Sequence, residues 1–328
     1  MKWTSLLLTF CFIACTGETV VNDHPAYQNP LVQPWNDSIA AHPENPYGYY
    51  YRAEMLSRVK EDSLALLDLK KAYELDSLNP DYATALGYVY LRLEQVENAI
   101  RAFQRKLKLK PGDARTRLLL SKAYLQAHHI EEAQQEVDKV LVAAPNYPDA
   151  LYWQAQIKAA QKDTAAAISF TQQALQIDSG YYAAAYQLGD YYRDQGRPEA
   201  VQQYRYVFSL DTLNADPLFD IAYYYEKQGQ WQRAKEAYYA CLLRDRDYTE
   251  AYLQTGKILL QQDSAEKAIR IFDLAILTAP NSAEAYFQKG KAFAEIGQKD
   301  SAETAYRQAL VFDPKHQPTL NAVQKLER

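Results

Sequence analysis

A repeat of 34 residues runs through most of this 328-residue chain and restricts the architecture into which it can fold. One position of the repeat is alanine in all eight copies, with a single interval of 33 residues: Ala65, Ala99, Ala133, Ala167, Ala200, Ala234, Ala268 and Ala302. A second position, 12 residues earlier (11 in the fifth copy), is always small: Ala53, Gly87, Ser121, Ala155, Gly189, Ala222, Gly256 and Gly290. A period of this length is typical of proteins that stack similar structural units.

Bulky residues recur at two further positions of the repeat. One is occupied by Leu56, Tyr90, Tyr124, Tyr192, Tyr225, Leu259 and Phe293, and the other by Leu69, Phe103, Val137, Tyr204, Tyr238, Phe272 and Tyr306. Small residues let two helices approach closely, while large residues fill the space between neighbouring helix pairs. We therefore expect these tyrosines in the core, where they carry no functional meaning.

The pattern resembles the tetratricopeptide repeat family, whose repeat is a helix, a turn and a second antiparallel helix of the same 34-residue length. The resemblance implies an all-α fold, a right-handed α-solenoid of tandem helix-turn-helix repeats. We place the eight repeats at 46–79, 80–113, 114–147, 148–181, 182–214, 215–248, 249–282 and 283–316. We expect one continuous array over 31–316 and not two domains.

Local signals agree with this register. Asn45 before Pro46, and Asn79 before Pro80, place a capping side chain directly ahead of a proline suited to the first helical turn. Glycines fit the turn that follows a first helix at Gly196, Gly229 and Gly297.

Both ends of the array carry features of a cap. Trp35, Ile39 and Pro43 fall in register with a second helix, so we interpret 31–45 as an N-terminal half-repeat whose helix spans 31–42. We predict that 317–328 forms a C-terminal capping helix. Its apolar face would consist of Leu320, Val323 and Leu326.

The first residues have the pattern of a secretory signal. Lys2 precedes an apolar run over 6–14, which is too short for a membrane span. The run ends in Phe12-Ile13-Ala14-Cys15, which resembles a bacterial lipobox. The resemblance implies that 1–14 is removed and that Cys15 is acylated, with palmitate or a similar chain. The alternative is an ordinary signal peptide in which the cysteine is incidental.

The segment that follows the cysteine predicts how the array is attached. Residues 15–30 lack helical periodicity and contain Pro and Asn, so we interpret them as a flexible tether. No later stretch approaches the roughly 20 apolar residues of a membrane span. After cleavage only Cys15 and Cys241 remain, which excludes a disulfide framework. We expect a lipid-anchored protein of the bacterial envelope, at the outer membrane, on its periplasmic or surface face.

The charge of the chain argues against nucleic acid as a partner. The formal net charge is −5 and becomes −6 when Lys2 is lost with the signal. One basic cluster, Arg105-Lys106-Leu107-Lys108-Leu109-Lys110, ends a predicted helix, where cations are favoured by the helix dipole and are usually solvated. The alternative is contact with acidic headgroups or an acidic partner, and Lys106 stands where the family prefers alanine.

Candidate residues for metal binding or catalysis are few. His128 and His129 lie beside Glu131 and Glu132 in a predicted turn, without the i, i+4 spacing that places two imidazoles on one helix face. No phosphate-binding glycine loop and no nucleophile, base and acid arrangement can be assembled from the sequence. We expect no enzyme activity, no metal and no cofactor.

The resemblance implies that the first helices line a concave groove. The fifth residue of each repeat is Tyr50, Thr84, Leu118, Tyr152, Tyr186, Phe219, Leu253 or Phe287, and the ninth is Glu54, Tyr88, Lys122, Gln156, Asp190, Tyr223, Lys257 or Lys291. The fifth residues predict an aromatic floor and the ninth a polar edge. We predict that partner binding involves Tyr50, Tyr88, Lys122, Tyr152, Tyr186, Asp190, Phe219, Tyr223, Lys257, Phe287 and Lys291.

Aromatic rings offer a large contact area at little entropic cost, which suits an extended peptide or a helix as ligand. The alternative for the fifth residues is that they pack against the next repeat. Some family members hold a partner's C-terminal carboxylate with lysine, arginine and asparagine. The first repeats here offer Tyr50, Glu54 and Tyr88 at such positions, which disfavours that clamp.

Three classes of function follow from these observations. The first is a non-catalytic, membrane-tethered scaffold that binds protein or peptide, similar to accessory lipoproteins of envelope assembly or secretion. The second is a glycan- or peptidoglycan-binding surface lipoprotein, suggested by the tyrosines together with Trp153 and Trp231. The third, an enzyme, has no residue set that we can name.

Overall fold

Every element that the computed structural model describes is a helix, which confirms the predicted all-α repeat solenoid. The structure describes residues 24–326. Within this range lie eighteen α-helices and one 3-10 helix, and no β-strand. The helices belong to two compact units, residues 24–143 and residues 144–326, and each unit is described by itself.

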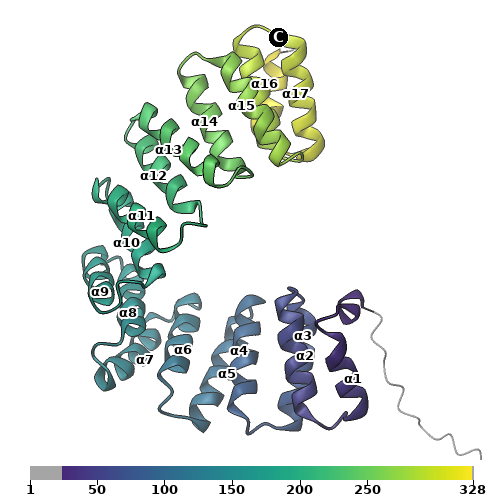
Figure 1. Ribbon diagram of the computed structural model, residues 1–328, viewed down its shortest axis with the longest axis vertical. Coiled ribbons are helices and arrows are strands. Elements are labelled where there is room, and N and C mark those ends of the chain that lie inside the picture. The colour runs from purple at the N-terminus through teal and green to yellow at the C-terminus, as the bar shows by residue number, and fades with distance from the viewer. Residues whose placement is uncertain (1–23, 327–328) are drawn as a thin grey trace, which may run out of the picture. The chain divides into compact units, whose positions relative to one another are not determined.

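The first unit holds a short N-terminal segment and three helix pairs (Figure 1). Its elements are η1 (Pro25–Gln28), α1 (Gln33–Ala41), α2 (Pro46–Arg58), α3 (Asp62–Leu75), α4 (Pro80–Arg92), α5 (Val96–Leu109), α6 (Ala114–Gln126) and α7 (Ile130–Ala143). The pairs α2–α3, α4–α5 and α6–α7 follow one another, and α1 packs on α2. Helix α1 lies within the segment 31–45, whose role as a half-repeat cap stays a prediction.

The second unit holds five helix pairs and a final single helix. Its elements are α8 (Pro148–Ala160), α9 (Thr164–Ile177), α10 (Tyr182–Asp194), α11 (Glu199–Leu210), α12 (Asp216–Lys227), α13 (Trp231–Arg244), α14 (Thr249–Gln261), α15 (Ala265–Thr278), α16 (Ala283–Glu295), α17 (Lys299–Phe312) and α18 (Gln317–Leu326). The first helix of each pair in both units begins at the first residue of its predicted repeat, or one residue later in α12. Helix α18 packs on α17, in the position of a cap.

The predicted capping residues and turn glycines are confirmed. The Asn45 side chain accepts a hydrogen bond from the Tyr47 amide at 3.0 Å, and Asn79 accepts one from Asp81 at 3.0 Å. These bonds satisfy amides that have no partner in the first turn of a helix. The three glycines between paired helices all have positive φ, of 65° for Gly196, 68° for Gly229 and 76° for Gly297.

The small residues of the repeat are all buried. The eight recurring alanines, from Ala65 to Ala302, are 0% exposed, and the residues of the second small position are buried as well. Ser121, the one polar member of that second position, donates a hydrogen bond to the Ala133 carbonyl at 3.0 Å. Close contact between the two helices of a pair therefore depends on these positions.

The bulky tyrosines follow the prediction in part. Four are buried: Tyr192, Tyr204, Tyr238 and Tyr306. The other three, Tyr90, Tyr124 and Tyr225, are half-buried and pack against the core. A tyrosine can bury its ring edge and keep its hydroxyl or one face near polar groups. The Tyr124 hydroxyl accepts from Gln104 Nε2 at 2.9 Å, and the Arg233 guanidinium lies 5.7 Å from the centroid of the Tyr225 ring.

The N-terminal segment packs against the first pair. Tyr27 is 3% exposed, its carbonyl accepts from Asn36 Nδ2 at 2.7 Å, and the Arg52 guanidinium lies 4.8 Å from the centroid of its ring. This differs from the flexible tether that we expected over residues 15–30, because its last residues are folded. Burial of the large Tyr27 ring stabilises this segment. The sequence did not predict this, because the segment has no helical periodicity.

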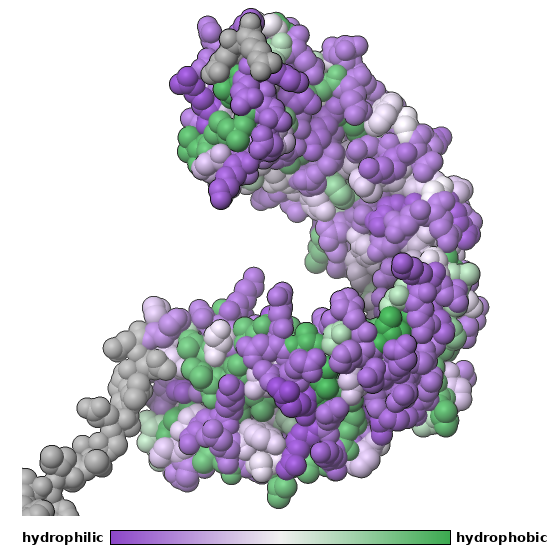
Figure 2. All heavy atoms as spheres, turned by 180° about the vertical axis from the view of Figure 1, so that it is seen from behind, coloured by the Kyte–Doolittle hydropathy of each residue, from purple (hydrophilic) through white to green (hydrophobic). Residues whose placement is uncertain are grey.

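The surface drawn in Figure 2 is mainly hydrophilic, with its apolar residues in separate small patches. None of the helices among residues 24–326 combines the length and the apolar character needed to cross a membrane. The predicted signal peptide and Cys15 lie outside the described residues. Cys241 is buried as a free thiol, and burial raises its pKa to about 12.

Candidate functional site

The first helices of neighbouring pairs lie side by side. In the second unit the Tyr186 hydroxyl of α10 donates to Asp220 of α12, and Lys257 Nζ of α14 lies 3.1 Å from a carboxylate oxygen of Glu284 in α16. In the first unit, residues of α2 and α4 line a common pocket. We call this side of each unit the first-helix face, and it carries the fifth and ninth residues of the repeats.

The fifth residues are engaged in packing. The ring of Tyr152 lies 5.3 Å from that of Tyr181, and the ring of Phe219 stacks on Tyr248 at 5.1 Å. Phe287 makes an edge contact with His316 at 5.2 Å, so three of these rings pack on the last residue of their own repeat. They remain half-buried, whereas Leu118 and Leu253 are 4% exposed each. These three rings of the expected aromatic floor are therefore half-buried and engaged in ring contacts within their own repeats.

Hydroxyl groups of the fifth residues are also engaged. Tyr50 donates to Glu54 at 3.1 Å, and its ring lies 5.2 Å from that of Tyr82. Tyr186 donates to Asp220. Burial, followed in each case by the neighbouring carboxylate, raises the pKa of Tyr50 and of Tyr186 above the usual range. Both phenols are therefore neutral donors at physiological pH. Loss of Tyr50 would remove a hydrogen bond from Glu54, and loss of Tyr186 would leave Asp220 paired with Arg193 alone.

The ninth residues are more open, and adjacent ones meet in pockets. Glu54 and Tyr88 line a pocket of about 220 Å³ between α2 and α4, together with Arg58 and Arg92. The Tyr88 ring makes an edge contact with Phe103 at 6.1 Å and is half-buried. The structure thus brings together two neighbouring ninth residues in the first unit.

Lys257 and Lys291 meet in the same way in the second unit. They line a pocket of about 260 Å³ between α14 and α16, together with Gln288 and Glu295. Lys257 is paired with Glu284, while Lys291 is exposed. Gln288 donates from Nε2 to Glu284 at 2.9 Å, and its buried Oε1 has no hydrogen-bond partner among the described residues.

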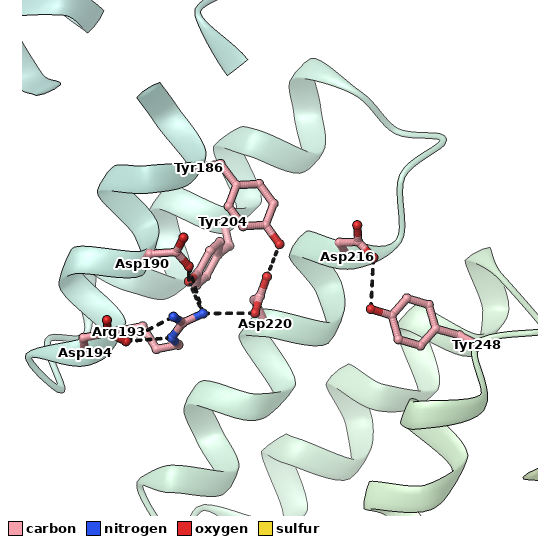
Figure 3. A network of polar contacts seen from close by, with 8 residues as sticks. All are labelled: Tyr186, Asp190, Arg193, Asp194, Tyr204, Asp216, Asp220 and Tyr248. Atoms are coloured by element: carbon pink, nitrogen blue, oxygen red, sulfur yellow. Dashed lines mark hydrogen bonds and ion pairs between the residues drawn. The ribbon is translucent and has the colours of Figure 1, made fainter. Parts of the chain in front are cut away.

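A polar network joins α10, α11 and α12 on this face (Figure 3). Arg193 Nη1 lies 2.8 Å from Asp190 and 3.2 Å from Asp220, and the buried Tyr204 donates to Asp190 at 2.7 Å. Burial raises the pKa of Asp220, although the Tyr186 hydroxyl and Arg193 oppose the shift. Sequence reasoning identified Asp190 and Tyr186 but missed Arg193 and Asp220. The i, i+3 spacing of Asp190 and Arg193 was the available signal.

The remaining predicted residues lie apart from these clusters. Tyr223, on α12, is half-buried, with the Lys227 ammonium 4.9 Å from the centroid of its ring. Lys122, on α6, is half-buried. Tyr50, Tyr88 and Lys122 belong to the first unit and the other predicted residues to the second. Their role in partner binding stays a prediction.

The basic cluster at the end of α5 divides into paired and unpaired residues. Lys106 is 9% exposed, and its ammonium lies 2.9 Å from Asp113. Burial opposes ionisation of Asp113, but the Thr116 amide and Lys106 outweigh it and lower the pKa of Asp113. Lys108 is exposed at the surface. Lys106 is therefore a structural residue that links α5 to the start of α6.

Other sequence candidates remain scattered. Within residues 24–326, no group of three or more His, Cys, Asp or Glu side chains is placed to hold a metal ion. His128 is the turn residue between α6 and α7, with a φ of 61°. Trp153 lies edge-on against Tyr152, and Trp231 is 36% exposed at the start of α13. The two tryptophans sit on different helix pairs, α8–α9 and α12–α13.

Comparisons with known proteins agree with the geometry. A family model described as tetratricopeptide repeat matches residues 90–157 and 225–289, and two further models of that description match 149–178 and 283–316. No curated protein matches the sequence.

Several solved structures share the fold. The C-terminal part of a TPR repeat-containing protein from Cytophaga hutchinsonii is 17% identical with a TM-score of 0.57, over 72% of this chain and 97% of that chain. A tetratricopeptide repeat protein from Parabacteroides merdae is 11% identical with a TM-score of 0.50, over 76% and 99% of the two chains. PilF of Pseudomonas aeruginosa is 19% identical with a TM-score of 0.50, over 65% and 97%. On the matched repeats and the shared helix-pair architecture, this chain belongs to the tetratricopeptide repeat family, whose fold is a scaffold for protein interaction.

Proposed function

We propose that this protein is a non-catalytic scaffold that binds protein or peptide partners along the first-helix faces of its repeats, while a lipid on Cys15 holds it at a bacterial membrane. The observation that carries the proposal is the pairing of neighbouring ninth residues in open pockets, Glu54 with Tyr88 and Lys257 with Lys291. Such pockets between adjacent helices accept successive side chains of an extended peptide or of one helix face.

The chemistry of the ninth row supports selective binding. Its residues differ from repeat to repeat in charge and in hydrogen-bonding capacity, so each pocket favours a different side chain. The fifth residues below them are held by packing and hydrogen bonds, which keeps the face rigid. A rigid face loses little conformational entropy when a partner binds.

Attachment to the membrane rests on the sequence around Cys15. A cleaved signal followed by an acylated cysteine would leave a short segment between the lipid and η1. We infer a location at the outer membrane, on its periplasmic or surface face, and a role as an accessory lipoprotein of envelope assembly or secretion. Mass spectrometry of the mature N-terminus tests the acylation. Replacement of Cys15 by Ser should move the protein from the membrane to the soluble fraction, and retention in the membrane would contradict the lipid anchor.

Partner binding is best tested by site-specific photo-crosslinking in the native envelope. A photoreactive residue at Tyr223 or at Lys291 samples the first-helix face without breaking the network of Arg193. Tyr186 is unsuitable, because its hydroxyl holds Asp220. Glu266, exposed on the second helix α15, provides the matched control.

We expect a defined protein to be crosslinked from Tyr223 and Lys291 and not from Glu266. The same protein should be lost when both residues are replaced by alanine with the helicity of the chain intact. Crosslinking from Glu266 alone, or equal yield from all three positions, would move the binding surface away from the first-helix face.

A further inference from the structure

A second kind of pocket lies in the first unit, between the second helices α3 and α5. It has a volume of about 290 Å³ and shares no lining residue with the pocket of Glu54 and Tyr88. Its floor comes from α4, including the half-buried ring of Tyr90, and Tyr73 of α3 contributes a second ring. A cavity of this size is at the small end of ligand sites and suits one compact group.

Cations dominate the lining of this pocket. Lys70 comes from α3, and Arg101 and Arg105 stand one helical turn apart on α5. Glu74 is the one carboxylate in the lining, and it lies 3.7 Å from Lys71. Within the part of the chain that the structure describes, no carboxylate lies within ion-pair distance of these three cations. The lining therefore has a formal charge of two positive.

Arg105 also carries an unused donor. Its Nε is buried and has no hydrogen-bond partner among the described residues. A buried N–H without an acceptor is unfavourable, and such groups are rare in folded proteins. Arg101 is oriented by Asn98, whose Oδ1 accepts from Nη2 at 2.5 Å. Asn98 thus orients the Arg101 guanidinium, while Arg105 lines the same pocket and has one N–H without an acceptor.

We propose that this pocket binds a phosphate monoester whose organic group lies against Tyr73 and Tyr90. A phosphate monoester carries nearly two negative charges at neutral pH and three strong acceptor oxygens, which match the charge and the donors of the lining. A carboxylate, a sulfate ester or a phosphodiester brings one charge and leaves the lining unbalanced. Arginine forks suit phosphate oxygens in particular. This site is independent of the first-helix faces.

The test is a titration of the full chain with phenyl phosphate, followed by calorimetry and by the arginine Nε–H resonances in nuclear magnetic resonance spectra. We expect saturable binding and a shift of the Arg105 Nε–H resonance. Phenyl sulfate and benzoate, as monoanions of similar shape, should bind at least about tenfold more weakly. Equal binding of phenyl sulfate, or no saturable binding of phenyl phosphate, would overturn the proposal.

Variants separate a specific site from general attraction. Arg105→Gln should weaken phenyl phosphate binding about tenfold or more, and Arg101→Gln, at an exposed position where folding is not at stake, should do the same. Lys108→Gln removes one charge from the same helix at an exposed position outside the pocket, so its effect should stay below about twofold. An equal loss in Lys108→Gln and Arg101→Gln would show diffuse attraction and exclude the site.

Two probes that each carry a phosphate monoester distinguish a lipid headgroup from a soluble ester as the natural ligand. Phenyl phosphate presents it on a ring, and dihexanoyl phosphatidic acid, kept below its micelle concentration, presents it on a glycerolipid. Tighter binding of the lipid assigns the pocket to a headgroup, and tighter binding of phenyl phosphate assigns it to a soluble ester. If inorganic phosphate binds as tightly as both, the proposed contact with Tyr73 and Tyr90 is wrong.

Discussion

A Cβ atom on Gly87 would lie 2.3 Å from Cε1 of Phe103, so the ring occupies the space that a side chain on Gly87 would need. The same relationship joins Gly256 to Phe272, at 2.4 Å. Where the residue of the first helix is Ala53, its counterpart on the second helix is the smaller Leu69. Glycine thus accompanies a large ring in these two repeats and Ala53 accompanies Leu69, whereas in the sixth repeat Ala222 accompanies the buried Tyr238.

Gly87→Ala should destabilise the first unit by about 1 to 3 kcal/mol, because the added methyl group overpacks the contact with Phe103. Denaturant unfolding and hydrogen exchange in α4 and α5 measure the change. Gly112→Ala is the control, since a Cβ there would meet nothing within 4 Å. Gly87→Ala combined with Phe103→Leu should recover part of the loss. A double variant less stable than either single one would contradict the size relationship.

The turn between paired helices should favour glycine. Lys162 has a φ of 64° in the turn between α8 and α9. Gly229 occupies the corresponding position in the turn between α12 and α13. Lys162→Gly should stabilise the second unit by up to about 1 kcal/mol, because a left-handed backbone strains any residue with a Cβ. Gly229→Ala should cost a similar amount. Thermal unfolding of both variants checks the pair, and a loss of stability in Lys162→Gly would mean that unfolded-state entropy outweighs the strain.

Arg52 should hold the N-terminal segment in place. It donates to both carboxylate oxygens of the buried Asp68 at 2.7 Å and to Asn36 at 3.1 Å. Arg52→Ala should cost about 1.5 to 3 kcal/mol, because Asp68 is left buried without its partner, and should speed hydrogen exchange in α1. Arg52→Lys keeps the positive charge but loses the paired hydrogen bonds to both oxygens of Asp68, so we expect an intermediate loss of stability.

Arg92 provides the matched control for Arg52. It makes the same two-pronged contact with Asp62, at 2.9 and 2.7 Å, but its side chain is 47% exposed. Arg92→Ala should therefore cost no more than about 1 kcal/mol. If both alanine variants lose the same stability, burial of Asp68 is not what gives Arg52 its importance.

Asp220 should make the stability of the second unit depend on pH. Because burial raises its pKa, the folded state binds this proton more tightly than the unfolded chain. The contribution of Asp220 to the free energy of unfolding therefore falls as pH rises from about 3.9 through the raised pKa. Asp220→Asn removes this loss, so the variant should gain stability relative to wild type as pH rises from about 4 through the raised pKa of Asp220.

Unfolding midpoints at several pH values measure this difference. The control is Asp247→Asn, at an exposed carboxylate in the turn before α14. The profiles of wild type and Asp247→Asn should run in parallel. If the stability profile of Asp220→Asn also runs parallel to that of wild type, then Tyr186 and Arg193 fully compensate the burial of Asp220.

The sequence determined the helix pairs. Caps such as Asn45 act through neighbours within a few residues, and small residues such as Ala65 recur every 34 residues where paired helices come into close contact. It also determined which residues share the first-helix face, since positions such as Lys257 and Lys291 recur at the period of the repeat. Their meeting in one pocket follows from the stacking of similar helix pairs.

The tertiary structure decided what the side chains do on that face. The contact of Tyr186 with Asp220 spans 34 residues, and the free Nε of Arg105 depends on the absence of an acceptor from α3 and α4 within the described first unit. The half-burial of Tyr90 and the folding of Tyr27 onto Arg52 were likewise not predicted. Such contacts depend on the reach and orientation of particular side chains across neighbouring helices, which the repeat pattern does not encode.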